Sequence, residues 1–279
     1  MTYCLGLRTA RGVLIAADSA ISSMGHVLSA CSGEGTTTFG ELQGNVGRGR
    51  WSHIEEAVLK LTVEADSVIG FAGDVDTGRC LIDLYLTLRM DAGSNGRDAV
   101  RKALSSVYPC QEQAEALFGF YDANEPYLMH VDIARGTVSE VEGLVQVGSV
   151  PQSQCTWTAR YVSKFLAMLE RLGPDPRQLD QVFAQLVALV QSYGVHDYLL
   201  PEGVGGAFVA AWVTPTGAQW QRDHLDVMHD TVPTSGEIVM CATMVRDGVL
   251  CLVNNQTGSS KLITWPGWRE SEQAVSARI

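Results

Sequence analysis

The beginning of the chain constrains its fold more than any other feature, because two apolar segments typical of β-strands follow one another at once. Residues 3–9 (YCLGLRT) and 12–18 (GVLIAAD) meet at ARG, residues 10–12, which has the length of a tight hairpin turn. Chain ends commonly fray and carry no chemistry. This chain instead enters its core almost immediately, so we expect Thr2 to be held close to that core.

Composition excludes several classes of protein. The 279 residues are 46% apolar and 18% charged, which is typical of a folded globular protein, and the net charge of −11 argues against nucleic-acid binding. No apolar run is long enough for a transmembrane helix or resembles a signal peptide. The seven cysteines form no CxxC pair, as expected for reduced thiols. We therefore predict a cytoplasmic protein with neither membrane nor nucleic-acid partners.

The order of predicted elements indicates the fold class. β-hairpins come first, followed by a helix pair, more β-strands, a second helix pair and final strands. Each of two sheets then needs a helical layer to cover its outer face, which predicts an α+β fold of four layers, an αββα sandwich. We expect one domain over residues 1–279, with a Gly- and Ser-rich flap inserted at about 19–57 and a polar tail from about 270.

Thr2 is the first candidate for chemistry. If the initiator methionine is removed, Thr2 becomes the N-terminal residue, with its hydroxyl as nucleophile and its α-amine as the adjacent base. The ordinary pKa of such an amine is about 8, which suits proton transfer near neutral pH. A site of this kind also needs a nearby cation, a carboxylate that holds the cation, and an oxyanion hole.

Three further residues fit those needs, although each has a simpler interpretation. Asp18 ends an apolar strand, where a strand-end cap is the simpler interpretation. Lys60 interrupts an apolar strand and is one of only four lysines among 20 basic residues, yet lysines are common on solvent-exposed edge strands. Gly73 closes the segment GFAG, where a backbone amide can approach a ligand, but glycines at strand ends are frequent.

Longer stretches carry a resemblance to a known family. The opening MTYC with VLIAADS, the segment GFAGDVDTGRCLIDLY and the strands up to QVGS resemble the proteasome-type N-terminal-nucleophile hydrolases, and most of all the bacterial Anbu group. The resemblance spans roughly residues 2–213. It implies that Thr2 is the nucleophile, that Asp18 and Lys60 support it, and that the Gly73 amide binds the oxyanion. It also implies accessory roles for Ser149, which otherwise reads as a helix cap, and for Asp197.

The chain departs from the family pattern in ways that concern the accessory residues. The flap separates Asp18 and Lys60 more widely than is usual, Val150 replaces a glycine, and Val204 replaces a serine. The Thr-Asp-Lys set keeps its residue types. The support that Ser149 and Asp197 provide is therefore expected to be rearranged.

The resemblance implies a threonine-type peptidase or amide hydrolase that needs no metal or organic cofactor. It also implies self-association into a ring or lock-washer and a peptide or unfolded-protein substrate, and it leaves open whether there is an unfoldase partner. Two alternatives stay open, a catalytically idle scaffold subunit and a small-molecule amidase on the same fold. The segment DHLDVMHD contains possible metal ligands, but a solvated acidic loop is the simpler interpretation.

Overall fold

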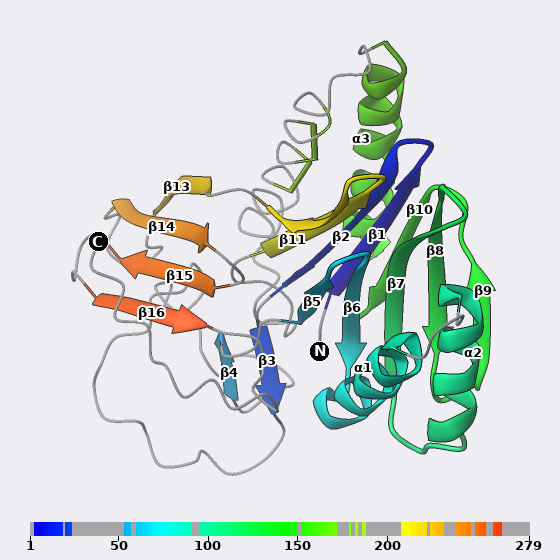
Figure 1. The fold of residues 1–279 in the computed structure, drawn as a ribbon. Coiled ribbons are helices and arrows are strands. Elements are labelled where there is room, and N and C mark those ends of the chain that lie inside the picture. Colours follow the sequence, from blue (N-terminus) through cyan, green and yellow to red (C-terminus); the bar gives the residue numbers. More distant parts are fainter. Residues whose placement is uncertain are drawn as a thin grey trace.

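The computed structural model shows a sandwich of two antiparallel five-stranded sheets (Figure 1). It describes residues 3–18, 20–23, 53–56, 60–90, 95–149, 152–171, 179, 182–183, 186–187, 208–221, 224–231, 238–246, 249–254 and 259–263, some of them by their backbone alone. Within the helices so described, none is long and apolar enough to cross a membrane.

The first sheet, here called sheet I, is built around the N-terminal hairpin. Its strand order is β10-β1-β2-β11-β12. The bounds are β1 Tyr3–Thr9, β2 Gly12–Asp18, β10 Leu144–Gly148, β11 Phe208–Thr214 and β12 Gly217–Trp220. The hairpin therefore occupies the centre of the sheet, and strands from much later in the chain flank it on both sides. Burial on both faces explains why the two hairpin strands are almost continuously apolar.

The second sheet, sheet II, has the strand order β5-β6-β7-β8-β9, so neighbours in the sequence are also neighbours in space. The bounds are β5 Leu61–Glu64, β6 Ser67–Gly73, β7 Ala114–Asp122, β8 Glu125–Asp132 and β9 Thr137–Glu140. Two helices, α1 (Val75–Met90) and α2 (Gly96–Val107), connect β6 to β7. Asn95 caps α2, because its side chain accepts a hydrogen bond from the amide of Asp98 at 2.8 Å.

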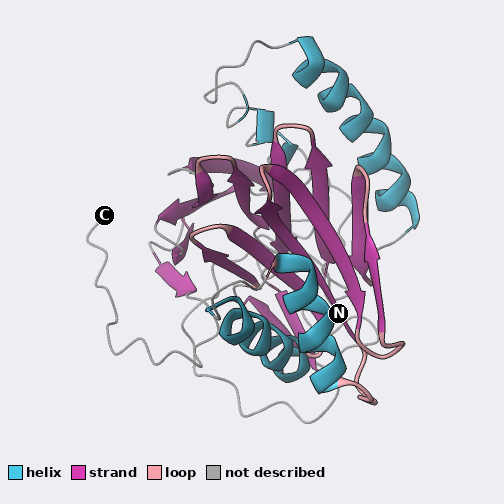
Figure 2. Ribbon diagram, turned by 45° about the vertical axis from the view of Figure 1, so that its right-hand side comes forward, coloured by secondary structure: helices cyan, strands magenta, loops and turns pink. Residues whose placement is uncertain are grey.

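Side chains alternate between layers and so produce three apolar clusters. Cys4, Ile15 and Val209 from sheet I meet Val68 and Leu117 from sheet II in the central layer. The opposite face of sheet I packs against α3 (Gln152–Arg171) and against a group of buried residues: Leu179, Val182, Phe183, Leu186 and Val187. Helices α1 and α2 cover the outer face of sheet II (Figure 2). The predicted αββα sandwich is confirmed.

The structure adds two smaller sheets that the two-sheet prediction lacked. Strands β3 (Ala20–Ser23) and β4 (His53–Glu56) pair with each other at the two ends of the predicted flap. Residues 24–52 between them lie outside the described part, so the flap stays a prediction. A four-stranded sheet is formed by β13 (His224–Thr231), β14 (Ile238–Arg246), β15 (Val249–Asn254) and β16 (Ser259–Ile263).

Strand β13 corrects the interpretation of DHLDVMHD as a loop. Its residues pair in antiparallel register with β14, from His224 opposite Val245 to Thr231 opposite Ile238. Leu225 and Val227 alternate with polar residues, which is the period-two pattern of a strand. The prediction of a loop gave too much weight to the acidic and histidine residues, which occupy the polar positions of this pattern.

Candidate active site

A buried ion pair joins the two sheets at the end where β2 finishes. Asp18 is the last residue of β2, and Lys60 directly precedes β5. Lys60 Nζ lies 2.6 Å from Asp18 Oδ1, and both side chains are fully excluded from solvent. The simpler interpretations, a strand-end cap for Asp18 and a solvent-exposed lysine at Lys60, are therefore wrong.

The energetics of this pair make it unusual in a protein core. Bringing two charges out of water costs several kcal/mol for each ion, and mutual attraction offsets that cost only when the geometry is close. The backbone places Lys60 well for this, because its carbonyl accepts a hydrogen bond from the Phe71 amide at 3.3 Å. A charged pair held in this way provides the cation and the supporting carboxylate that a nucleophilic site requires.

The same carboxylate also fixes the start of β1. Asp18 Oδ1 accepts a hydrogen bond from the backbone amide of Tyr3 at 3.1 Å. Thr2 lies outside the described residues and directly precedes Tyr3 in the sequence. The ion pair is therefore anchored to the residue that follows the predicted nucleophile.

The side chain of Tyr3 ties β1 to its neighbours on the other face of sheet I. Its hydroxyl donates a hydrogen bond to Gln146 Oε1 at 2.8 Å, and Gln146 Nε2 donates to the carbonyl of Cys155 in α3 at 3.1 Å. Burial raises the pKa of the Tyr3 phenol, so it stays neutral and acts as a donor. Tyr3 is therefore held from both its backbone and its side chain.

Cys4 borders the ion pair in the central layer but does not act as a nucleophile there. It is fully buried, and burial, with the Asp18 charge as the next contribution, raises the pKa of its thiol. A protonated, enclosed thiol is unreactive. The Cys4 sulfur also leaves no room for a side chain at Gly70, because a Cβ added there would lie 2.8 Å from Sγ. This close approach of β6 to the hairpin requires glycine.

Gly73 ends β6 in a conformation that side chains rarely adopt. Its φ is +101°, and an added Cβ would lie 2.2 Å from the carbonyl oxygen of Gln113. That same carbonyl accepts a hydrogen bond from the Asp74 amide at 3.0 Å, which fixes the turn into α1. Glycine is thus required twice, for the backbone angle and for the space.

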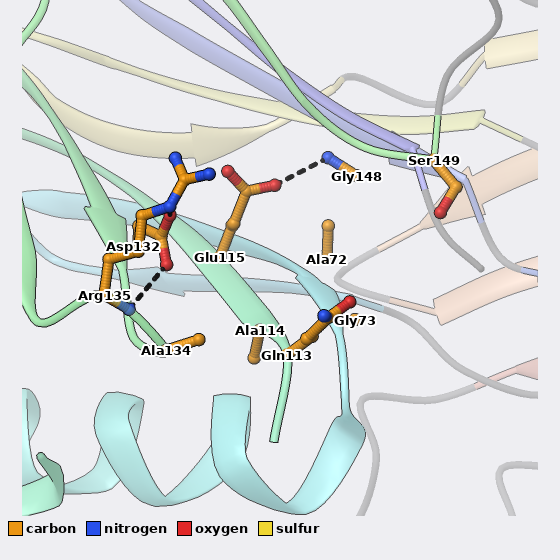
Figure 3. Close-up of a pocket in the computed structure, with 10 residues that line it drawn as sticks. All are labelled: Ala72, Gly73, Gln113, Ala114, Glu115, Asp132, Ala134, Arg135, Gly148 and Ser149. Atoms are coloured by element: carbon orange, nitrogen blue, oxygen red, sulfur yellow. Dashed lines mark hydrogen bonds and ion pairs between the residues drawn. The ribbon is translucent and has the colours of Figure 1, made fainter. Parts of the chain in front are cut away.

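A cavity of about 340 Å³ opens beside Gly73 (Figure 3). Its lining comes from the ends of β6, β7, β8 and β10. The lining residues include Gly73, Glu115, Asp132, Arg135 and Ser149. Ser149 is exposed directly after β10 and lines the cavity together with Gly73. The cavity is of the size of known ligand pockets.

Glu115, which the sequence analysis did not single out, has the best-defined polar contacts in this cavity. One carboxylate oxygen accepts a hydrogen bond from the Gly148 amide at 3.0 Å, and the other lies 3.0 Å from Nε2 of His130. The hydrogen bond to His130, followed by that from Gly148, holds the pKa of Glu115 below its usual range, although burial acts in the other direction. The carboxylate is therefore charged at neutral pH.

The structure brings part of the predicted set together. Asp18 and Lys60 are in direct contact, and Gly73 and Ser149 line one cavity. Thr2 and Asp197 lie outside the described residues, so their roles stay predictions. Across the part of the chain for which side chains are described, no group of three or more His, Cys, Asp or Glu residues is arranged to hold a metal ion.

Fold and layer order define a class: the chain has the proteasome-like N-terminal-nucleophile hydrolase fold. The solved structure of an Anbu Gly-1 mutant from Hyphomicrobium sp. strain MC1 superposes on the chain with a TM-score of 0.51 at 16% sequence identity. The superposed region covers 80% of this chain and 85% of the Anbu chain. Eukaryotic HslV from Trypanosoma brucei also matches, with a TM-score of 0.47 at 12% sequence identity. That match covers 76% of this chain and 99% of the HslV chain.

Comparisons of sequence gave no further match. No family model matches the chain, and no curated protein matches it. The structural likeness to Anbu is thus a likeness of fold, at an identity too low to transfer an activity.

Proposed function

We propose that the protein is a hydrolase of amide bonds in peptides that uses Thr2 as an N-terminal nucleophile after removal of Met1. One observation carries the proposal: the buried Lys60–Asp18 pair, at 2.6 Å, is hydrogen-bonded to the amide of Tyr3, the residue after Thr2. A fold alone needs no ion pair at this place, because apolar residues of similar volume often serve a core equally well.

In the proposed reaction, the Thr2 hydroxyl attacks the substrate carbonyl and passes its proton to its own α-amine. The ammonium of Lys60 favours the developing alkoxide, and Asp18 keeps that ammonium in place. The oxyanion is bound by the Gly73 amide. The leaving amine takes the proton as the C–N bond breaks, which leaves an ester on Thr2, and water then hydrolyses the ester to release the acid.

The proposal extends to the setting of the enzyme. Its accessory residues are Ser149, which lines the cavity beside Gly73, and Asp197. We expect a cytoplasmic homo-oligomer that encloses its sites and cleaves peptides or unfolded segments. A partner that unfolds substrates fits an enclosed site, and its identity is left to experiment.

The test is the intact mass of the purified protein before and after reaction with a peptide epoxyketone, a reagent that needs both the hydroxyl and the free amine of an N-terminal threonine. We expect loss of Met1 and one adduct that peptide mapping places on Thr2. Lys60→Ala should slow adduct formation strongly, whereas Lys102→Ala, an exposed lysine on α2, should not.

Retention of Met1 with no adduct would contradict the proposed chemistry and would favour an idle scaffold subunit. An adduct that forms equally fast in Lys60→Ala would contradict the role of the ion pair alone. Cleavage of small amides but of no peptide would favour the small-molecule amidase.

A further inference from the structure

We propose that Glu115 is a positioning residue that holds the turn Gly148–Ser149 at the edge of the active site. The catalytic consequence rests on the function proposed above, whereas the contact itself does not. Glu115 is the second residue of β7 in sheet II, and Gly148 ends β10 in sheet I. The hydrogen bond between them therefore crosses from one sheet to the other.

The position of Gly148 gives this bond its importance. In the pairing of β1 with β10, Gly148 lies opposite Tyr3. Its φ is +94°, so the chain leaves the strand sharply at this residue, and Ser149 then lines the cavity. A carboxylate that fixes the Gly148 amide thus fixes the backbone on which Ser149 is carried, next to the strand that begins directly after Thr2.

Glu115 is itself held by its neighbours in sheet II. His130 of β8 lies 3.0 Å from the carboxylate oxygen that does not bind Gly148. Asp132, directly opposite Glu115 in the ladder, forms its contacts with Arg135: its oxygens are 3.0 Å from the Arg135 amide and 3.5 Å from Nε. Cys4 of β1 stays an uncharged thiol, because burial, and to a smaller extent the charges of Asp18 and Glu115, raise its pKa.

The negative charge on Glu115 strengthens its hydrogen bond with the Gly148 amide. A hydrogen bond to an ionised acceptor is shorter and about twice as strong as one between neutral groups. The two carboxylate oxygens have different partners. One accepts from the Gly148 amide of sheet I, and the other contacts His130 of sheet II. Figure 3 shows the Glu115 carboxylate directed toward Gly148, with a dashed line for their hydrogen bond.

The test compares Glu115→Ala and Glu115→Gln with the matched control Glu140→Gln. Glu140 is also a carboxylate of sheet II that reaches sheet I, through Arg8 of β1 at 2.6 Å, but it does not line the cavity. The first readout is amide hydrogen exchange of Gly148. We expect exchange about tenfold faster in Glu115→Ala, an intermediate effect in Glu115→Gln, and no change in Glu140→Gln.

The second readout is peptide cleavage, separated into kcat and KM. Misplacement of Ser149 should lower kcat on the order of tenfold to a hundredfold in Glu115→Ala with a smaller change in KM, and Glu115→Gln should restore part of kcat because its amide oxygen still accepts from Gly148. The kcat is expressed per active site, counted by epoxyketone titration, so that a general loss of folding would lower the number of sites and leave kcat and KM unchanged.

The two proposals fail in different ways. Unchanged Gly148 exchange in Glu115→Ala overturns the positioning role whether or not the wild type is active. Faster exchange with unaltered kcat overturns its catalytic consequence. Absence of cleavage and of epoxyketone adduct in the wild type overturns the proposed function, while the exchange result still decides whether Glu115 holds the turn.

Discussion

Asp18 and Glu115 are two carboxylates that each connect sheet I to sheet II, and they do so in contrasting surroundings. Asp18 is fully buried against Lys60, whereas the side chain of Glu115 is 33% exposed and binds a backbone amide and a histidine. Both act near Tyr3, the first through its amide and the second through Gly148, its partner in the ladder.

The contrast shows that one edge of a site can combine a carboxylate with a large desolvation cost and one with a small desolvation cost. A buried pair resists solvent and salt, but the loss of either partner leaves a charge in the core. A partly exposed carboxylate costs less to place, because water still solvates part of its charge. We therefore expect changes at the buried pair to be far more disruptive than changes at Glu115.

The largest effect is expected from Lys60→Ala. The substitution leaves the Asp18 carboxylate buried without its ammonium partner, which should lower the free energy of unfolding by about 3–5 kcal/mol. Peptide cleavage should fall by about 10²–10⁴-fold. Urea denaturation and initial rates measure the two effects, and wild-type turnover in this variant would contradict the role of Lys60.

A double substitution, Asp18→Asn with Lys60→Met, separates those two effects. The asparagine oxygen still accepts from the Tyr3 amide, and the pair no longer contains a charge. We expect the free energy of unfolding to recover to within about 1–2 kcal/mol of the wild type, with activity still as low as in Lys60→Ala. Recovery of activity together with stability would show that the pair serves only to fold the protein.

Gly73→Ala should be the next most severe change. The added Cβ meets the Gln113 carbonyl at 2.2 Å in a backbone conformation with φ of +101°, so we expect a loss of about 3 kcal/mol or more. Gly143→Ala is a matched control, because φ is +86° there and nothing lies within 4 Å of an added Cβ. Its expected cost is about 1 kcal/mol, and equal costs in urea denaturation would contradict a steric role for Gly73.

Tyr3→Phe tests the other anchor of β1 and should have a moderate effect. It removes the hydroxyl that donates to Gln146 Oε1 at 2.8 Å and keeps the ring in place. We expect a loss of about 1 kcal/mol in the free energy of unfolding, measured by thermal or urea denaturation. A loss of several kcal/mol would show that the hydroxyl supports more of the sheet I and α3 contact than this bond.

The smallest effect is a pH dependence at Glu115. Because its pKa is lowered in the folded protein, the stability it contributes is fully present above its unfolded pKa of about 4.3 and is lost as pH falls through the folded pKa. The difference in Tm between wild type and Glu115→Gln should therefore shrink as the pH is lowered toward 3. A difference that grows with acidification would contradict the stated direction of the shift.

Local patterns were enough to predict the layers and to leave a buried charge at Asp18 as one of two interpretations, whereas its association with Lys60 was implied by the family resemblance. The apolar hairpin, the single lysine in an apolar strand and the helix pairs all follow from short-range periodicity. The decision between a cap and a buried partner for Asp18 depended on whether Lys60 lies opposite it, which is a contact between residues 42 apart in the chain.

Glu115 could not be predicted from the sequence either, because its role depends on several contacts between residues that are distant in the chain. In AEALFGFYD it looks like an ordinary solvent-facing residue at a strand end. Its role depends on the register that brings His130 near it and on the packing of sheet II against sheet I, which puts Gly148 within reach. No spacing in one strand encodes an arrangement that two sheets create together.

The central place of the hairpin in sheet I also determines when the site can form during synthesis. Strand β1 pairs with β10, and β2 pairs with β11, whose last residue is Thr214. A ribosome that has released only the hairpin has therefore made neither flanking strand. Most of the chain must emerge before the first residues are locked into their sheet, so a nascent chain carries no completed candidate site until its translation is well advanced.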